Sequence, residues 1–158
     1  MRKYAKLYNP IVSFVLRLGL PLGPQALLTV TGRHSGLPRT TPVAINRNGD
    51  GWHLISVYGR VDWVRNLEAA RRALITRRLR RFQVTARQLA PDEAASVLRE
   101  TFSTANPLIR SLLGRYFDAD PNDPLEVWLE EATRHPVFFL TPVSESRYQV
   151  PSTKYPVE

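Results

Sequence analysis

Three short apolar runs separated by tight turns constrain the fold of this chain more than any other feature of its 158 residues. The runs are 26–31 (ALLTVT), 39–46 (RTTPVAIN) and 52–58 (WHLISVY), and they are rich in β-branched and aromatic residues. The turn 47–51 (RNGDG) joins the last two and contains Asn-Gly and Asp-Gly, which are strong hairpin signals. We therefore expect an antiparallel meander of three strands, with Pro42 at an edge or a bulge of the second.

The rest of the chain adds further strands and several helical stretches. Apolar or alternating runs predict strands at 73–76, 79–89 and 137–141. Helices are predicted after a cap at Asp62, at 91–104, from Asn106-Pro107 to 117, and around Trp128. Strands and helices do not alternate, which disfavours a doubly wound nucleotide-binding fold. The order predicts a mainly β fold, a closed or partly open barrel of about six mostly antiparallel strands with flanking helices.

No repeat or linker divides the chain, so we expect one domain over residues 1–158. Within it we expect an N-terminal helical segment at 1–25, the barrel at 26–142 and a polar tail at 143–158. Basic and apolar residues alternate through 2–18, which suits either a helix packed over one end of the barrel or peripheral contact with an anionic membrane. No stretch resembles a signal peptide or a membrane span. We therefore expect a cytoplasmic protein, with the inner membrane face as a second location.

The charge of the chain is distributed unevenly. Residues 1–90 carry 16 basic and 3 acidic side chains, whereas residues 91–158 carry 6 basic and 11 acidic ones. The first part therefore has a net charge of +13 and the second part −5. Such an excess concentrates anions such as nucleic acid, an acidic membrane or a phosphorylated cofactor. The alternative is a basic surface that only contacts solvent.

The sequence lacks residue types and motifs that several kinds of active site need. The chain has no cysteine, and its three histidines, His34, His53 and His135, are isolated from one another, so no metal site is expected. The serine-nucleophile elbow, the phosphate loop and the dinucleotide fingerprint are all absent. The carboxylates of the C-terminal third are interpreted as helix caps and solvated surface. If the protein is an enzyme, a bound cofactor must carry the reaction.

A glycine-rich bend between the first two strands carries the clearest functional signal, within 29–43 (TVTGRHSGLPRTTPV). Gly32 and Gly36 allow positive φ and close approach of a ligand to the backbone. Arg33 and Arg39 flank the bend and could contact phosphate or carboxylate oxygens, with hydroxyl donors nearby. The alternative is a hairpin turn with two solvated arginines.

This bend, read as TGRHSGLPRTTPV over 31–43, resembles the signature of the deazaflavin (F420)-dependent nitroreductase and quinone reductase family. The segment 56–60 (SVYGR) resembles a second feature of that family, a turn of small residues after the third strand. Trp63 and Asn66 resemble the Trp and Asn on the short helix that follows this turn. The segment 135–137 (HPV) also resembles the end of the family's barrel. Together the similarity extends over residues 26–142.

The resemblance implies a split β-barrel like that of FMN-binding proteins, and coenzyme F420 as the cofactor. It implies an oxidoreductase that passes a hydride from reduced F420 to a small electron-poor acceptor such as a quinone, enone or nitro compound. By the same resemblance, the cofactor would contact Arg33, His34, Ser35, Gly36, Arg39, Pro42, Val43, Ser56, Val57, Tyr58, Gly59, Arg60, Trp63 and Asn66. Tyr116 is the counterpart of a tyrosine in the acceptor pocket. The turn at 58–60 is shorter than in the nitroreductase branch, so the tail site is better supported than the ring site.

Three alternatives remain open at the level of sequence. A split barrel can bind FMN, because an arginine-rich turn does not distinguish one phosphate tail from another. A non-catalytic barrel could grip a fatty acid or a similar apolar anion. Nucleic-acid binding is not expected, because Trp63, Phe82 and other aromatic residues occupy predicted core positions and offer no stacking platform. The oligomeric state and the physiological acceptor are not indicated by the sequence.

Overall fold

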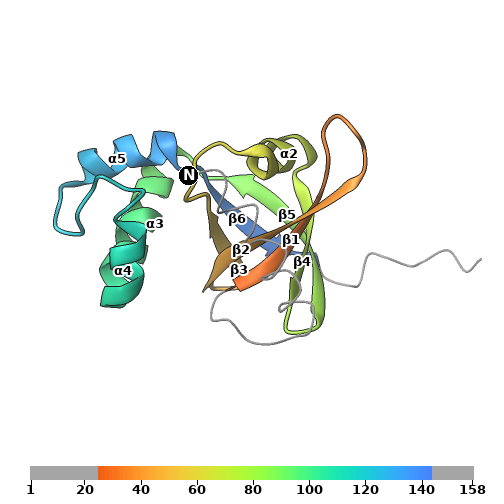
Figure 1. Cartoon of the computed structure of the whole chain (residues 1–158), viewed down its shortest axis with the longest axis horizontal. Helices are drawn as coiled ribbons and strands as arrows, with labels where there is room; N and C mark the ends of the chain where they lie inside the picture. The colour runs from red at the N-terminus through yellow and green to blue at the C-terminus, as the bar shows by residue number, and fades with distance from the viewer. Residues whose placement is uncertain (1–24, 144–158) are drawn as a thin grey trace, which may run out of the picture.

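The computed structural model describes residues 25–143 of the chain, as six strands and four helices (Figure 1). The strands are β1 (Gln25–Thr31), β2 (Pro38–Asn48), β3 (Gly51–Ile55), β4 (Arg72–Arg77), β5 (Arg80–Gln88) and β6 (Val137–Pro142). The helices are α2 (Asp62–Ala70), α3 (Pro91–Thr104), α4 (Pro107–Leu113) and α5 (Leu125–Arg134). Three predictions fall outside the described residues: the helical segment over 1–25 (apart from Gln25), the peripheral membrane contact through 2–18, and the polar tail (apart from Val143).

The six strands form a closed barrel in the order β1-β2-β3-β6-β5-β4, and every neighbouring pair is antiparallel. The predicted meander β1-β2-β3 is confirmed, and Gly49 and Asp50 form its second turn. β6 is the last strand within residues 25–143, yet it lies between β3 and β5. This confirms the predicted mainly β fold, a barrel of six strands with flanking helices.

Strand β2 contacts its two neighbours at different places along its length. Residues 38–44 pair with β1, whereas residues 45–48 pair with β3. Pro42 lies opposite Leu27 of β1, in the stretch that β3 does not reach. A proline, which lacks an N–H, is therefore placed where the strand has one neighbour, as predicted for an edge position.

Three boundaries differ from the sequence-based prediction. The third strand ends at Ile55 and not at 58, because the backbone turns at Ser56. The helix that begins at Pro107 ends at Leu113 and not at 117, although the Asn106 side chain caps it as expected by accepting from the Ile109 N–H at 2.9 Å. The prediction that Asp62 caps α2 was wrong, because it is the first helical residue.

Buried apolar side chains form two separate clusters. The first fills the barrel and includes Leu28, Ile45, Leu54 and Phe138. The second joins α3, α5 and the loop before α5 to the outside of the barrel, and Trp128 is its largest buried side chain. Figure 1 shows the same division, because α3, α4 and α5 gather on one side of the barrel while α2 packs beside β1 and β4.

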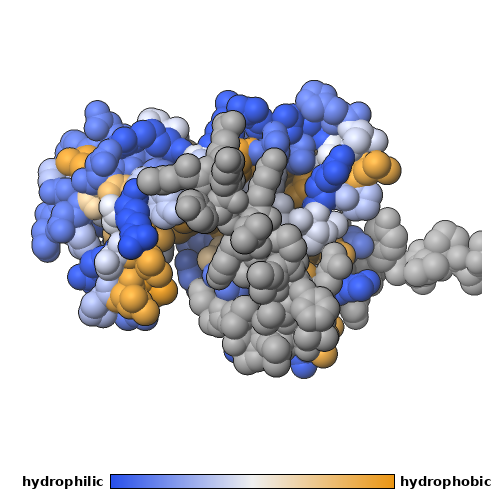
Figure 2. All heavy atoms as spheres, in the orientation of Figure 1, coloured by the Kyte–Doolittle hydropathy of each residue, from blue (hydrophilic) through white to orange (hydrophobic). Residues whose placement is uncertain are grey.

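The helical side carries an exposed apolar surface. Helix α4 buries none of its residues, and Leu108, Ile109 and Leu112 are exposed large hydrophobic side chains on it. In Figure 2 hydrophobic atoms gather at the lower end of the helical side. No helix within residues 25–143 is long and apolar enough to cross a membrane.

Candidate functional site

The glycine bend (residues 32–39) is a tight turn held by its own backbone. The Gly32 N–H donates to the Leu37 carbonyl at 2.8 Å, and the Gly36 N–H donates to the Gly32 carbonyl at 2.9 Å. Gly36 has a φ of +67°, and a Cβ on Gly32 would lie 2.6 Å from Ser35 Oγ. Glycine is therefore favoured at Gly36 by the positive φ and at Gly32 by the close approach of Ser35 and of the Leu37 carbonyl. Ser35 Oγ accepts from the Leu37 N–H at 3.2 Å, so this hydroxyl is also used within the bend.

The two arginines of the bend have different environments. Arg33 is bound to α2: its N–H and its guanidinium donate to Asn66 Oδ1 at 3.1 and 2.9 Å, and its guanidinium lies 3.3 Å from the Asp62 carboxylate. Asn66 is only 6% exposed, so this contact fastens the bend to the helix. Arg39 is exposed and has no side-chain partner among residues 25–143. Of the two arginines, Arg39 is the one whose side chain is not already bound, and the His34 side chain is also exposed.

The N-terminus of α2 lies directly beside the bend. Its N-cap residue is Val61, which has no side chain able to accept a hydrogen bond from the first turn. The Asp62 carboxylate faces Arg33 instead of capping the helix. Free N–H groups and the helix dipole favour a negative charge at this end of the nine-residue helix. The uncapped helix end is therefore held against the bend through Arg33, and the bend also carries the exposed Arg39.

The turn from β3 to α2 brings two predicted site residues together. Ser56 is buried, its N–H donates to the Pro136 carbonyl at 2.9 Å, and its hydroxyl donates to the Gly59 carbonyl. Gly59 has a φ of +77°, which allows the chain to reverse. Tyr58 projects from this turn, and its ring meets the Tyr116 ring edge to face, with 5.1 Å between ring centroids. Tyr58 and Tyr116 therefore form one aromatic surface, although they are far apart in the sequence.

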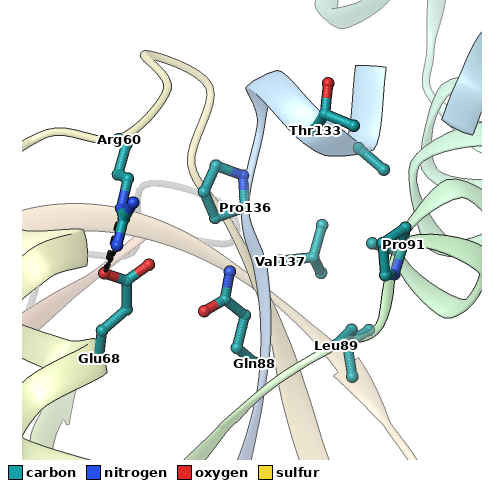
Figure 3. A pocket seen from close by; sticks show the side chains of 10 residues that line it. Arg60, Glu68, Gln88, Leu89, Pro91, Thr133, Pro136 and Val137 are labelled. Carbon is teal, nitrogen blue, oxygen red and sulfur yellow. Dashed lines mark hydrogen bonds and ion pairs between the residues drawn. The ribbon is translucent and has the colours of Figure 1, made fainter. Parts of the chain in front are cut away.

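Arg60 points away from the bend. Its guanidinium pairs with the Glu68 carboxylate at 2.7 Å, and this hydrogen bond raises the pKa of Arg60 (Figure 3). The pair lies at a cleft of about 300 Å³ between the barrel and the helices. The cleft is lined by Arg60, Glu68, Gln88, Leu89, Pro91, Ala94, Ala132, Thr133, Pro136 and Val137. No residue of the glycine bend lines this cleft, so bend and cleft are two separate features.

Three further residues of the predicted site pack against the apolar core. Val43 is buried in the barrel core, and Val57 packs against the helical cluster. Trp63 is half-buried, and its ring lies 6.2 Å from that of Phe138. These contacts place Val43, Val57 and Trp63 in the framework around the site.

Comparison with protein families decides the identity of the chain. The profile of the F420H(2)-dependent quinone reductase family matches residues 1–111, which include the bend and the Ser56 turn. The chain belongs to this family. The reductase is therefore an F420-dependent oxidoreductase, and F420 is its cofactor. Comparison with curated proteins gives no match.

Solved structures agree with the fold of the reductase. An F420-H2 dependent reductase (FDR-A) is 19% identical, with a TM-score of 0.50 over 74% of this chain and 93% of that one. A pyridoxamine 5'-phosphate oxidase-related, FMN-binding protein from Nostoc punctiforme is 11% identical, with a TM-score of 0.53 over 85% and 80%. The heme storage protein HutZ from Vibrio cholerae is 14% identical, with a TM-score of 0.51 over 85% and 89%. At these identities the similarity establishes the split-barrel fold.

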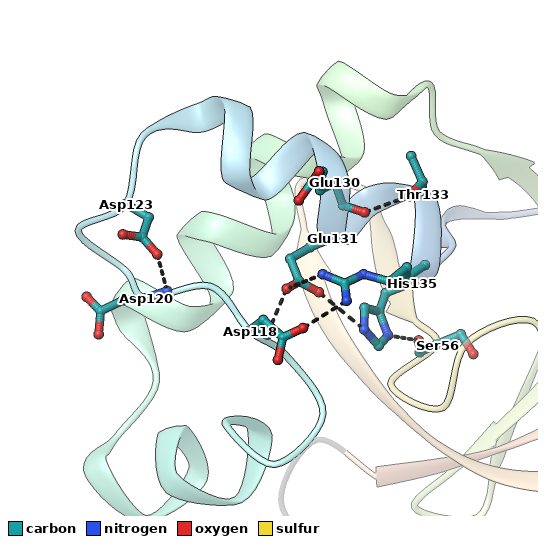
Figure 4. Close-up of polar contacts among 9 residues, drawn as sticks. Ser56, Asp118, Asp120, Asp123, Glu130, Glu131, Thr133 and His135 are labelled. Carbon is teal, nitrogen blue, oxygen red and sulfur yellow. Dashed lines mark hydrogen bonds and ion pairs between the residues drawn. The ribbon is translucent and has the colours of Figure 1, made fainter.

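The sequence analysis missed one buried group of polar side chains in the reductase. Glu131 was interpreted as solvated surface and His135 as an isolated histidine, but both are buried and face each other (Figure 4). His135 also contacts the Ser56 carbonyl, which lies 79 residues earlier in the chain. The one available signal was the spacing of Glu131 and His135, which places the two side chains on one face at the end of a helix.

Proposed function

We propose that this reductase transfers a hydride from reduced F420 to a small electron-poor acceptor, of the class of quinones, enones and nitro compounds. The observation that carries the proposal is that the family match includes the glycine bend, where Arg39 has no side-chain partner within residues 25–143. Arginine is suited to phosphate and carboxylate groups, because its fork of N–H donors can bind two oxygens at once.

The residues of the bend fit the anionic part of the cofactor. F420 has a phosphodiester and an oligoglutamate tail, so it needs cations and hydrogen-bond donors rather than an enclosed apolar pocket. Arg39 and His34 are exposed, Arg33 holds the bend against the uncapped N-terminus of α2, and Gly36 has no atom near the position of a Cβ. Arg33 would act mainly by holding the bend against α2, because its guanidinium is already bound to Asn66.

The turn after β3 would contact the ring side of the cofactor and the acceptor. Tyr58 and Tyr116 offer two aromatic edges and faces at one place, which suits a flat electron-poor molecule. When bound, reduced F420 would supply a hydride, and the single proton that the acceptor also takes up is balanced by the proton that the cofactor loses on oxidation. The chain's part is to hold the acceptor in line and to exclude water, and no side-chain base is required.

Substitution of Arg39 by alanine tests the tail site. Loss of one charge-assisted hydrogen bond, about 1.5–3 kcal/mol, would weaken F420 binding by about 10- to 100-fold. The dissociation constant is measured by quenching of F420 fluorescence, and the thermal unfolding midpoint should stay unchanged because Arg39 is exposed. Arg81→Ala, which removes another exposed arginine from β5, is the matched control and should leave F420 binding unchanged. Equal effects of the two substitutions would contradict the tail site.

The acceptor class is tested separately. Reduced F420 is mixed with the protein and with menadione, an α,β-unsaturated ketone or a nitroaromatic compound, and its oxidation is followed by absorbance. Oxidation with at least one of them is expected. Tight F420 binding with no oxidation by any of the three would refute the acceptor class while leaving the tail site intact.

A further inference from the structure

The buried pair Glu131 and His135 lies at the junction between the barrel and the helices. Their exposed fractions are 0% and 6%, and a carboxylate is rarely buried unless it is paired and hydrogen-bonded. Neither side chain belongs to the glycine bend or to the proposed acceptor surface. We call Glu131, His135 and the Ser56 carbonyl the carboxylate–histidine bridge.

On one side, the bridge holds the turn that carries Tyr58. His135 Nδ1 lies 3.2 Å from the Ser56 carbonyl, and because a carbonyl only accepts, Nδ1 carries the hydrogen and donates it. The N–H and the hydroxyl of Ser56 are also bonded, to the carbonyls of Pro136 and Gly59. All polar groups of Ser56 are thus engaged, so the start of the Tyr58 turn is fixed.

On the other side, the bridge holds the segment that carries Tyr116. Glu131 Oε1 accepts from the Asp118 N–H at 2.7 Å and from the Arg134 guanidinium at 3.0 Å. Phe117 stacks on the His135 ring, with 4.0 Å between ring centroids and 29° between planes. The segment directly after Tyr116 is therefore fixed by both members of the pair.

The two members also face each other. Glu131 Oε2 lies 3.4 Å from His135 Nε2, which is within ion-pair range although the contact lacks hydrogen-bond geometry. The chain from Ser56 through His135 and Glu131 to Asp118 is continuous, as Figure 4 shows. It connects two segments that are far apart in sequence and that meet again at the Tyr58–Tyr116 ring contact.

We infer that Glu131 and His135 are positioning residues, which set the geometry of the Tyr58–Tyr116 surface by fixing the segments that carry the two rings. The inference rests on the proposed function, since that function gives the tyrosine pair its role toward the acceptor. Neither Glu131 nor His135 touches the acceptor. Their loss is expected to act on acceptor binding and not on F420 tail binding, because the glycine bend is held by other contacts.

Two substitutions of His135 distinguish a role in positioning the Ser56 carbonyl from a role in packing against Phe117. An asparagine amide reaches roughly the place of Nδ1 and can still donate to the Ser56 carbonyl, whereas a glutamine amide replaces Nε2 and loses that donor. Both substitutions remove the ring stacked on Phe117. His135→Gln is expected to raise the KM for menadione about tenfold, the value of one hydrogen bond, with little change in kcat. His135→Asn should recover most of that loss, and Glu130→Gln, at an exposed position on the same helix, is the control.

The nuclear Overhauser contact between the Tyr58 and Tyr116 rings is measured in the same proteins without cofactor. The contact should be present in the control and in His135→Asn, and lost in His135→Gln. Equal behaviour of the two His135 variants, or an intact ring contact in His135→Gln, would overturn the inference. If the unsubstituted protein reduces no acceptor, the proposed function fails while the ring contact still decides the positioning role.

A measurement on the unsubstituted protein covers the case in which His135→Gln does not fold. The nitrogen chemical shifts of the His135 ring should show a hydrogen on Nδ1, bonded to the Ser56 carbonyl. An Nδ1 without hydrogen, or without coupling to that carbonyl, would remove the contact on which the inference depends.

Discussion

The glycine bend and the carboxylate–histidine bridge differ in burial and in the range of their contacts. The bend is exposed, and its internal hydrogen bonds join residues no more than five positions apart. The bridge is buried, and its contact between His135 and Ser56 joins residues 79 positions apart. In the proposed function the bend presents charge to the cofactor, whereas the bridge holds distant segments in register. A local motif is enough for the first task, and only the packed fold can perform the second.

Removal of the bridge carboxylate should have the largest effect on folding. Glu131→Ala leaves the partly buried Asp118 N–H and the buried His135 without their partner, and the free energy of unfolding should fall by about 3 kcal/mol. Chemical denaturation measures the change. Glu130→Ala on the same helix removes an exposed carboxylate and should change stability little. A similar loss in both variants would mean that the bridge is no more important than the surface of α5.

Alanine substitution of Gly36 in the bend and of Gly59 in the Ser56 turn compares how much stability each turn loses. Gly59→Ala places a methyl group in the left-handed region and 3.2 Å from the Arg134 carbonyl, whereas the same change at Gly36 meets nothing within 4 Å. Backbone strain alone should cost about 1 kcal/mol at Gly36, and strain with crowding about 2 kcal/mol at Gly59. Denaturation midpoints of the two variants test this order. An equal loss would show that the neighbouring helix yields without cost.

Alanine substitution of the two arginines of the bend should affect different properties, the stability of the fold for Arg33 and F420 binding for Arg39. Arg33→Ala removes hydrogen bonds to the nearly buried Asn66 and should lower the free energy of unfolding by about 1 kcal/mol. Arg39→Ala should leave stability unchanged while it weakens F420 binding. Thermal unfolding of both variants, with and without F420, measures the two effects. A loss of stability on Arg39→Ala would indicate that it is part of the framework.

The smallest effect is expected for an exposed ion pair that also joins the barrel to the helices. Arg87 on β5 donates to the Glu93 carboxylate on α3 at 2.8 Å, and this hydrogen bond lowers the pKa of Glu93 below 4.5. A lowered folded-state pKa means that the stabilisation is present above pH 4.5 and is lost as the pH falls through the folded value. Glu93→Gln should therefore reduce stability slightly at pH 7, and the difference should shrink as the pH falls through the lowered pKa of Glu93. A pH-independent difference would assign the effect to α3 capping alone.

Local chemistry explains what could be predicted from the sequence. The turn at Gly49-Asp50 follows from the Asn-Gly and Asp-Gly pairs, and the bounds of α3 follow from Pro91 and the acidic residues after it. Two kinds of contact could not be predicted. The partner of Arg33 depends on how α2 packs on the barrel, and Asn66 lies 33 residues away. Glu131 was placed at the surface because carboxylates usually lie there. Its burial depends on a loop N–H and a histidine that only the folded chain brings to it.

The position of β6 has a consequence for synthesis of the protein. Because this last strand lies between β3 and β5, both of those strands keep an unpaired edge until residues 137–142 have left the ribosome. An incomplete chain therefore carries two open edges at which a neighbouring nascent chain can add a strand. Closure of the barrel therefore waits for residues 137–142, and until they emerge the nascent chain is open to incorrect strand pairing at both edges.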